Sequence, residues 1–258
     1  MADEKIRLGG MALANGVLVH GPTSWGCAVR LPSGELKVAS GPKRLRSAGI
    51  DNPFLRGPAR LAEVFALLPE LRRRLPEARL PFERPGIIAA LLGSGVAVRV
   101  VRSSPIRPAA QELASGLLAL APALLALRGG ELAAYHGAEH VSIGSYEQGE
   151  RAAREHERCG GHLVGPLVAT TVLGNTLAGR APIHLRGPAR LAASLGAIAA
   201  SMEIFGWMVK HPRNPLARAL SRPGHELQHR FSTAEPSPAQ LEVAEAALAA
   251  CLELEQAA

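Results

Sequence analysis

Four apolar stretches constrain the fold of this chain more than any other feature of its sequence. They cover residues 87–98, 113–127, 163–179 and 191–209. The first two are shorter than the about 20 apolar residues that a membrane-crossing helix needs, and they end at Arg99 and Arg128. The third contains Asn175 and the fourth contains Glu203. Buried helices of a soluble core show a similar pattern, but arginine-containing segments flank three of the stretches, which favours membrane-associated helices.

The rest of the sequence predicts a mainly α fold of the α+β class. Ala and Leu dominate the apolar residues, which favours helices, and aromatic residues make up only 3% of the chain. Near the N-terminus, apolar runs at 11–20, 25–31 and 36–39 are separated by Gly21-Pro22 and by a turn at 32–35, which predicts a β-hairpin or meander. We therefore expect a β-rich segment at 1–50 and a helical, membrane-associated bundle at 51–258, together forming one continuous domain.

Two further helices are predicted from local signals. Pro58 in a first helical turn predicts a helix that begins at Gly57 and runs to Leu75, with a kink or break at Pro69. An amphipathic pattern over residues 238–254 predicts a terminal helix that packs as a cap.

The charge and the cysteines limit the partners and the compartment. The net charge of +7 indicates an anionic partner. Five Phe, two Tyr and two Trp offer few platforms for stacking bases, so an anionic membrane lipid is expected and nucleic acid is not. Cys27, Cys159 and Cys251 are an odd number without compact spacing, which predicts free thiols in a reducing compartment. Residues 1–7 are charged and lack the features of a secretory signal, which predicts a cytosolic N-terminus.

A short motif, His136-Gly137-Ala138-Glu139-His140, predicts a metal site. Residues at i, i+3 and i+4 share one face of a helix, so the two imidazoles and the carboxylate point the same way. The spacing is that of the inverzincins, in which the two His residues bind zinc and the Glu is the general base. Gly137 is small enough to let another element approach closely. A surface helix without a metal is the alternative interpretation.

The motif supplies only two metal ligands, so a third must come from elsewhere in the chain. His156, Cys159 and Glu203 are the candidates, and zinc accepts each of these donor types. With Glu203 as the ligand, the fourth position would be left for water and Glu139 would take its proton. Such a site suits hydrolysis of an amide, ester or phosphoester held near Arg158.

Two other functions remain open at this point. In the first, His136, His140, Cys159 and either His156 or His162 close a structural zinc site that stabilises a non-catalytic membrane or scaffold protein. In the second, the basic chain is an adaptor that associates with RNA or a ribosome, an interpretation that rests on charge alone.

Several separated segments resemble the YqhQ-like family of bacterial proteins, which carries a domain of unknown function, DUF1385. They are Gly9-Gly10, Asn15-Gly16-Val17, Gly21-Pro22, Leu55-Arg56-Gly57, residues 135–140, Tyr146-Glu147, Arg158-Cys159-Gly160, Pro223-Gly224, Gln228 and Glu235-Pro236. The resemblance implies a membrane-associated, metal-dependent protein without an established substrate, located at the bacterial inner membrane or its cytoplasmic face. The chain departs from the family at Asn15, where an acidic residue is usual, and at residues 156–161, where the family reads His-Pro-Arg-Cys-Gly-Thr.

Overall fold

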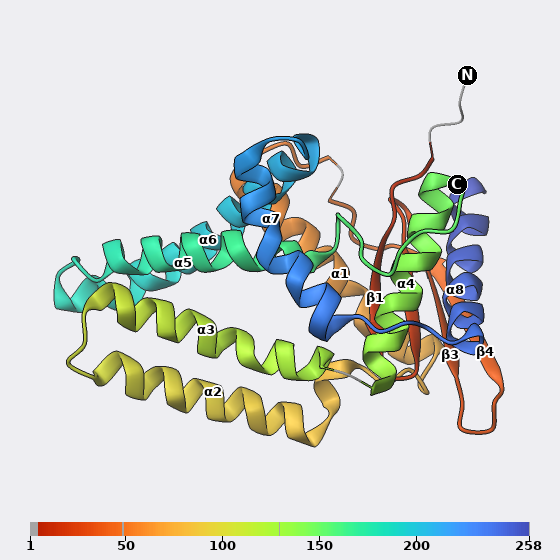
Figure 1. Cartoon of the computed structure of the whole chain (residues 1–258), viewed down its shortest axis with the longest axis horizontal. Coiled ribbons are helices and arrows are strands. Elements are labelled where there is room, and N and C mark those ends of the chain that lie inside the picture. The colour runs from red at the N-terminus through yellow and green to blue at the C-terminus, as the bar shows by residue number, and fades with distance from the viewer. Residues whose placement is uncertain (1–4, 48, 129, 258) are drawn as a thin grey trace.

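The computed structural model of the chain describes residues 5–47, 49–128 and 130–257 (Figure 1). Its strands are β1 (Gly9–Leu13), β2 (Gly16–His20), β3 (Ser24–Arg30) and β4 (Leu36–Pro42). Its main helices are α1 (Pro53–Arg74), α2 (Pro85–Ser103), α3 (Pro108–Leu127), α4 (Gly130–Gln148), α5 (Val164–Ala178), α6 (Arg186–Lys210), α7 (Pro215–Leu227) and α8 (Pro238–Gln256). The prediction of a mainly α fold with an N-terminal β segment is confirmed, and residues 1–4, part of the expected cytosolic N-terminus, lie outside the described ranges.

The four strands form an antiparallel meander in the order β1-β2-β3-β4. The predicted run at 11–20 is two strands rather than one, because Asn15 lies in a turn where its side chain accepts from the Arg79 amide (2.9 Å) and donates to the Glu77 carbonyl (3.1 Å). Alternate residues of each strand face opposite sides of the sheet. Thus Val17 and Val19 pack with α4 and α8, whereas Leu18 packs with the C-terminal half of α1.

Helix α1 begins at Pro53, four residues before the predicted start at Gly57. The Asn52 side chain caps the helix by accepting a hydrogen bond from the Phe54 amide (2.9 Å), a role that suits Asn at this position. The helix continues without interruption through Pro69. The terminal helix agrees with its prediction. Ser237, directly before α8, and Gln240, in its first turn, form a capping box that begins the helix.

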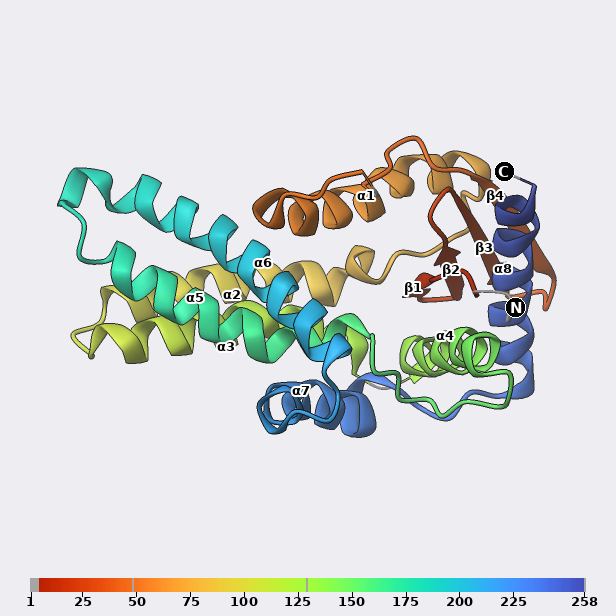
Figure 2. The same cartoon turned by 90° about the horizontal axis from the view of Figure 1, so that it is seen from above.

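The four apolar stretches form two helical hairpins, α2 with α3 and α5 with α6, which extend together from the sheet to one end of the molecule (Figures 1 and 2). Three helical segments of the described chain are long and apolar enough to cross a membrane: Pro85–Ser103, Pro108–Leu127 and Ile183–Lys210. Many of their large apolar side chains are exposed, including Leu92 and Leu191. Because water does not favour such a surface, the hairpins suggest membrane association.

Candidate metal centre

Helix α4 carries the His136–His140 motif and is buried along most of its length. Its neighbours are β1, α8 and the segment that follows α7. Gly137 has the close neighbour that its small size predicted: a Cβ at this position would collide with the carbonyl oxygen of Ala234. The Ala234 amide in turn donates to the carbonyl of Ala133 in α4 (2.9 Å). A larger residue at 137 would therefore push the 233–236 segment away from the helix.

Each imidazole of the motif uses one nitrogen to fix its orientation and leaves the other available. His136 donates from Nδ1 to the carbonyl oxygen of Ser232 (2.8 Å), and His140 donates from Nδ1 to that of Arg154 (2.6 Å). These bonds place the proton on Nδ1, so the lone pair is on Nε2. Histidines that bind metals are commonly held in this way by a carbonyl or carboxylate partner.

Cys159 comes from the loop after α4 and supplies a third donor atom. Its sulfur lies 3.6 Å from Nε2 of His136 and accepts a hydrogen bond from the Gly161 amide (3.3 Å). One donor atom each from His136, His140 and Cys159 lie within 4.8 Å of one another. These three residues, which we call the ligand cluster, can hold a metal ion.

The chemistry of the ligand cluster fits a divalent cation. Burial lowers the pKa of His140 to about 2, with the neighbouring His136 adding to the effect, so its imidazole is neutral as a ligand must be. Burial also raises the pKa of the Cys159 thiol to about 12. A metal ion reverses this second effect, because coordination by a cation favours the thiolate. Two imidazoles and one thiolate form a set that zinc accepts.

Glu139 lies beside the ligand cluster and forms no ion pair with any residue that the structure describes. Burial raises the pKa of its carboxyl group to about 8, and no hydrogen bond from the described residues offsets that effect. The side chain packs against Gly10 of β1, where a Cβ would collide with the carboxylate. Glu139, His136, His140 and Cys159 all line one cavity of about 380 Å³, between β1, α4 and the 156–161 segment.

The remaining predicted ligands are engaged elsewhere. His156 lines the same cavity, but its Nε2 lies 3.2 Å from Glu147 and its Nδ1 accepts from the Arg158 amide (3.3 Å). Both oxygens of Glu203 on α6 accept hydrogen bonds from Arg56, and this carboxylate is not part of the ligand cluster.

His162, the alternative fourth ligand of a closed site, also has both ring nitrogens occupied. Its Nδ1 donates to the carbonyl oxygen of Ser221 (2.9 Å), and its Nε2 accepts from Gln228 (3.0 Å). The ligand cluster therefore contains three residues of the described chain rather than four.

The cavity has a second polar wall that the sequence did not reveal. His20 of β2 lines it, and Lys43 donates to Nδ1 of this histidine (3.0 Å) while forming a buried ion pair with Glu63 of α1. Burial, with the positive charge of Lys43, lowers the pKa of His20 to about 4. A Cβ at Gly9 would lie 2.8 Å from Nε2 of His20. Gly9 and Gly10 thus leave room for His20 and Glu139, respectively.

Residues 131–254 match the model of a family described as a protein of unknown function, DUF1385. This range includes the ligand cluster, Glu139, His156 and Glu203, but neither His20 nor the sheet. No curated protein and no solved structure gives a significant match to the chain.

Proposed function

We propose that this chain is a membrane-associated, zinc-dependent hydrolase of the YqhQ-like type. The observation that carries the proposal is the ligand cluster, whose three donor atoms lie within 4.8 Å of one another beside a cavity that Glu139 also lines. Catalytic zinc sites commonly use three protein ligands and keep one position open.

The alternative of a closed structural zinc site has less support. Such a site needs a fourth ligand from His156 or His162, and both ring nitrogens of each are already hydrogen-bonded. Using either residue as a ligand would break at least one of these hydrogen bonds. A cavity of about 380 Å³ beside the ligand cluster also exceeds what a closed site requires.

The residues around the cavity have distinct roles in this proposal. His136, His140 and Cys159 would hold the ion, which when bound supplies a Lewis acid that activates water and polarises a carbonyl or phosphoryl oxygen. The pKa of the neighbouring Glu139 would be lowered by a bound cation, and its carboxylate would then accept the proton of the attacking water and return it to the leaving group. His20, with Lys43 behind it, presents its Nε2–H to the cavity and can donate a hydrogen bond to a substrate oxygen.

Metal analysis and two substitutions test the proposal. Purified protein should contain about one zinc per chain by inductively coupled plasma mass spectrometry, and His140→Ala should lose it. Glu139→Gln should keep the zinc and lose hydrolysis of whichever ester, amide or phosphoester a screen identifies. Glu150→Gln, the same change at an exposed position beyond α4, is the matched control. Zinc far below one per chain would refute the proposal, and full turnover by Glu139→Gln would exclude this residue as the base.

We also propose that the hairpins contact anionic membrane lipids. The support comes from the two turns at the far end of the hairpins (Figure 1), where segments 99–112 and 180–190 contain six arginines and one carboxylate, Glu112. Glu112 is buried and pairs with Arg102 (3.0 Å) and Arg190 (3.3 Å), which joins the two hairpins. Exposed Arg107 and Arg186 remain available for phosphate groups.

Lipids that co-purify with the protein in polymer-excised discs test this contact. Anionic lipids should be enriched around the wild type relative to the bulk membrane, and replacing Arg107 and Arg186 by Gln should reduce the enrichment. Equal lipid composition around the two proteins would contradict the contact.

A further inference from the structure

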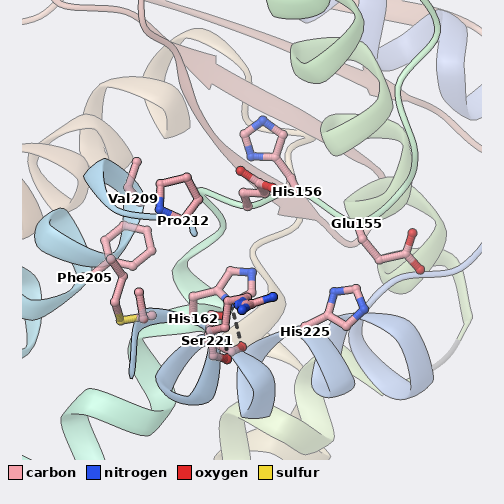
Figure 3. Close-up of a pocket in the computed structure, with 12 residues that line it drawn as sticks. Glu155, His156, His162, Phe205, Val209, Pro212, Ser221 and His225 are labelled. Atoms are coloured by element: carbon pink, nitrogen blue, oxygen red, sulfur yellow. Dashed lines mark hydrogen bonds between the residues drawn. The ribbon is translucent and has the colours of Figure 1, made fainter. Parts of the chain in front are cut away.

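A second cavity, of about 400 Å³, is lined by residues of the 155–162 segment and shares His156 with the cavity beside the ligand cluster. Figure 3 shows Phe205, Val209 and Pro212 along one side of it, and His156 and His225 along the other. Met208 and Ala217 extend the apolar side, so the cavity has one apolar wall from α6 and α7 and one polar wall from the loop and α7. Cavities that bind small molecules often combine such walls.

The two cavities meet at His156, in a segment that its neighbours hold in place. His156 lines both cavities, and its ring centroid lies 5.6 Å from that of His140 in the ligand cluster. Buried Gln228 holds this segment by accepting from the His156 amide (2.8 Å) and donating to His162 (3.0 Å). Gly224 of α7 packs so closely on this segment that a Cβ would lie 2.5 Å from the Cα of His162.

The apolar wall belongs to a helix that can cross a membrane. Phe205, Met208 and Val209 lie in the last two turns of α6, inside the Ile183–Lys210 segment. Lys210 and the polar residues after it end this apolar segment. The second cavity therefore lies at the level where the membrane-embedded part of the hairpin gives way to the domain that carries the ligand cluster.

We propose that the second cavity binds the hydrocarbon chain of a single-chain amphiphile, whose polar group reaches past His156 to the ligand cluster. This assignment rests on the proposed function and specifies its substrate class: a lipid-like ester, amide or phosphoester that enters from the bilayer. The apolar wall removes the hydrocarbon chain from water, which favours binding. The polar wall faces the end of the molecule that carries the reacting group.

Photo-crosslinking in native membranes tests the assignment. Membranes that contain the full-length protein are irradiated with a diazirine-bearing fatty acid, and the labelled peptides are identified by mass spectrometry. We expect labelling within residues 205–212, together with labelling of lipid-facing residues such as Leu92. Val209→Trp fills the cavity and should reduce the first signal about tenfold or more, equivalent to about 1.4 kcal/mol, while the second signal is unchanged.

Two further variants serve as controls. One fills the cavity from another helix, and the other places a large side chain on α6 outside the cavity. Ala217→Leu fills the cavity from α7 and should have the same effect as Val209→Trp. Leu195→Trp, on the exposed apolar surface of α6, should leave the 205–212 signal intact. Unchanged labelling of 205–212 in both filling variants, or labelling confined to lipid-facing residues in the wild type, would overturn the assignment.

Zinc content separates this inference from the proposed function. The filling variants should keep about one zinc per chain, because neither residue belongs to the ligand cluster. Zinc without cavity labelling would overturn the amphiphile site and leave the hydrolase proposal standing. Cavity-dependent labelling of a zinc-free protein would overturn the hydrolase and leave a lipid-binding site.

Discussion

The buried ion pair between Lys43 and Glu63 gives the sharpest stability prediction. Only 2% of the Lys43 side chain and 9% of the Glu63 side chain are exposed. Glu63 also accepts hydrogen bonds from the amide (2.7 Å) and the hydroxyl of Ser47, and Lys43 also donates to His20. Lys43→Met removes the positive charge and leaves a carboxylate buried without its counterion. Breaking one partner of such a pair costs about 3–5 kcal/mol.

The double variant Lys43→Met/Glu63→Leu should recover most of this loss. Replacing both charges by apolar groups of similar volume is often neutral, because the desolvation of two ions is no longer required. For a chain of this length, each kcal/mol corresponds to about 2–4 °C in melting temperature. We therefore expect Lys43→Met to melt about 6–20 °C lower and the double variant to melt near the wild type.

Thermal unfolding followed by circular dichroism in one detergent measures both variants. Arg46→Met, a neighbouring change at an exposed arginine, is the control and should change the melting temperature little. Two results would refute the reasoning. One is a loss of unfolding free energy below about 1 kcal/mol in Lys43→Met, and the other is a loss in the double variant that equals the sum of the two single losses. Zinc content should stay near one per chain in the folded variants, because His20 lines the cavity without belonging to the ligand cluster.

Four other predictions follow, three from individual residues and one from the helical hairpins. Gly137→Val should destabilise the protein by about 1–3 kcal/mol or more, because the new side chain collides with Ala234. A reduced melting temperature measures this loss. Cys159→Ser should weaken zinc binding in a chelator competition, because a hydroxyl is a poorer zinc ligand than a thiolate. Burial alone would raise the pKa of Glu255, but hydrogen bonds from Thr23 and Ser24 hold this pKa below the usual 4.5. The ionised carboxylate therefore stabilises the folded protein above that pH, and this contribution is lost as the pH falls through the lowered pKa. The difference in stability between the wild type and Glu255→Gln should accordingly shrink in acid. Resistance of the protein to alkaline carbonate extraction would support membrane-crossing hairpins, and full release would exclude them.

Local sequence signals predicted the elements of the fold because the forces behind them act over a few residues. Alternating apolar residues and the turns at Asn15 and Gly34 define the meander, and the capping box at Ser237 defines the start of α8. The helical spacing of His136, Glu139 and His140 placed three side chains at one cavity. Each of these features lies within one helix or between neighbouring strands, so the periodicity of the sequence and its capping residues determine it. The division of one continuous domain into segments 1–50 and 51–258 stays a prediction.

The third ligand and the far wall of the cavity depend on packing between distant segments. The sequence offered His156, Cys159 and Glu203 on equal chemical grounds, and the path of the loop after α4 places Cys159 near His136. Glu203 instead pairs with Arg56, 147 residues away. His20 had no visible partner in the sequence, because Lys43 and Glu63 reach it only when β2, the end of the sheet and α1 are packed together. The pair Gly9-Gly10 indicates that other side chains pack closely against β1. It does not indicate which side chains these are.

The orientation of the ligand cluster depends on the position of the α5–α6–α7 unit. The carbonyl oxygens that fix His136 and His140 belong to Ser232 and Arg154, which lie after and before this unit in the chain. Gln228 ties the same two flanking segments together through the His156 amide, and Gly224 of α7 packs against His162. If a bilayer holds α5 and α6, it also fixes the carbonyls that select which imidazole nitrogens carry lone pairs. Zinc affinity is therefore best measured with the hairpins in a membrane. A detergent that shifts α6 would lower the zinc affinity of the ligand cluster although it contacts none of the three ligands.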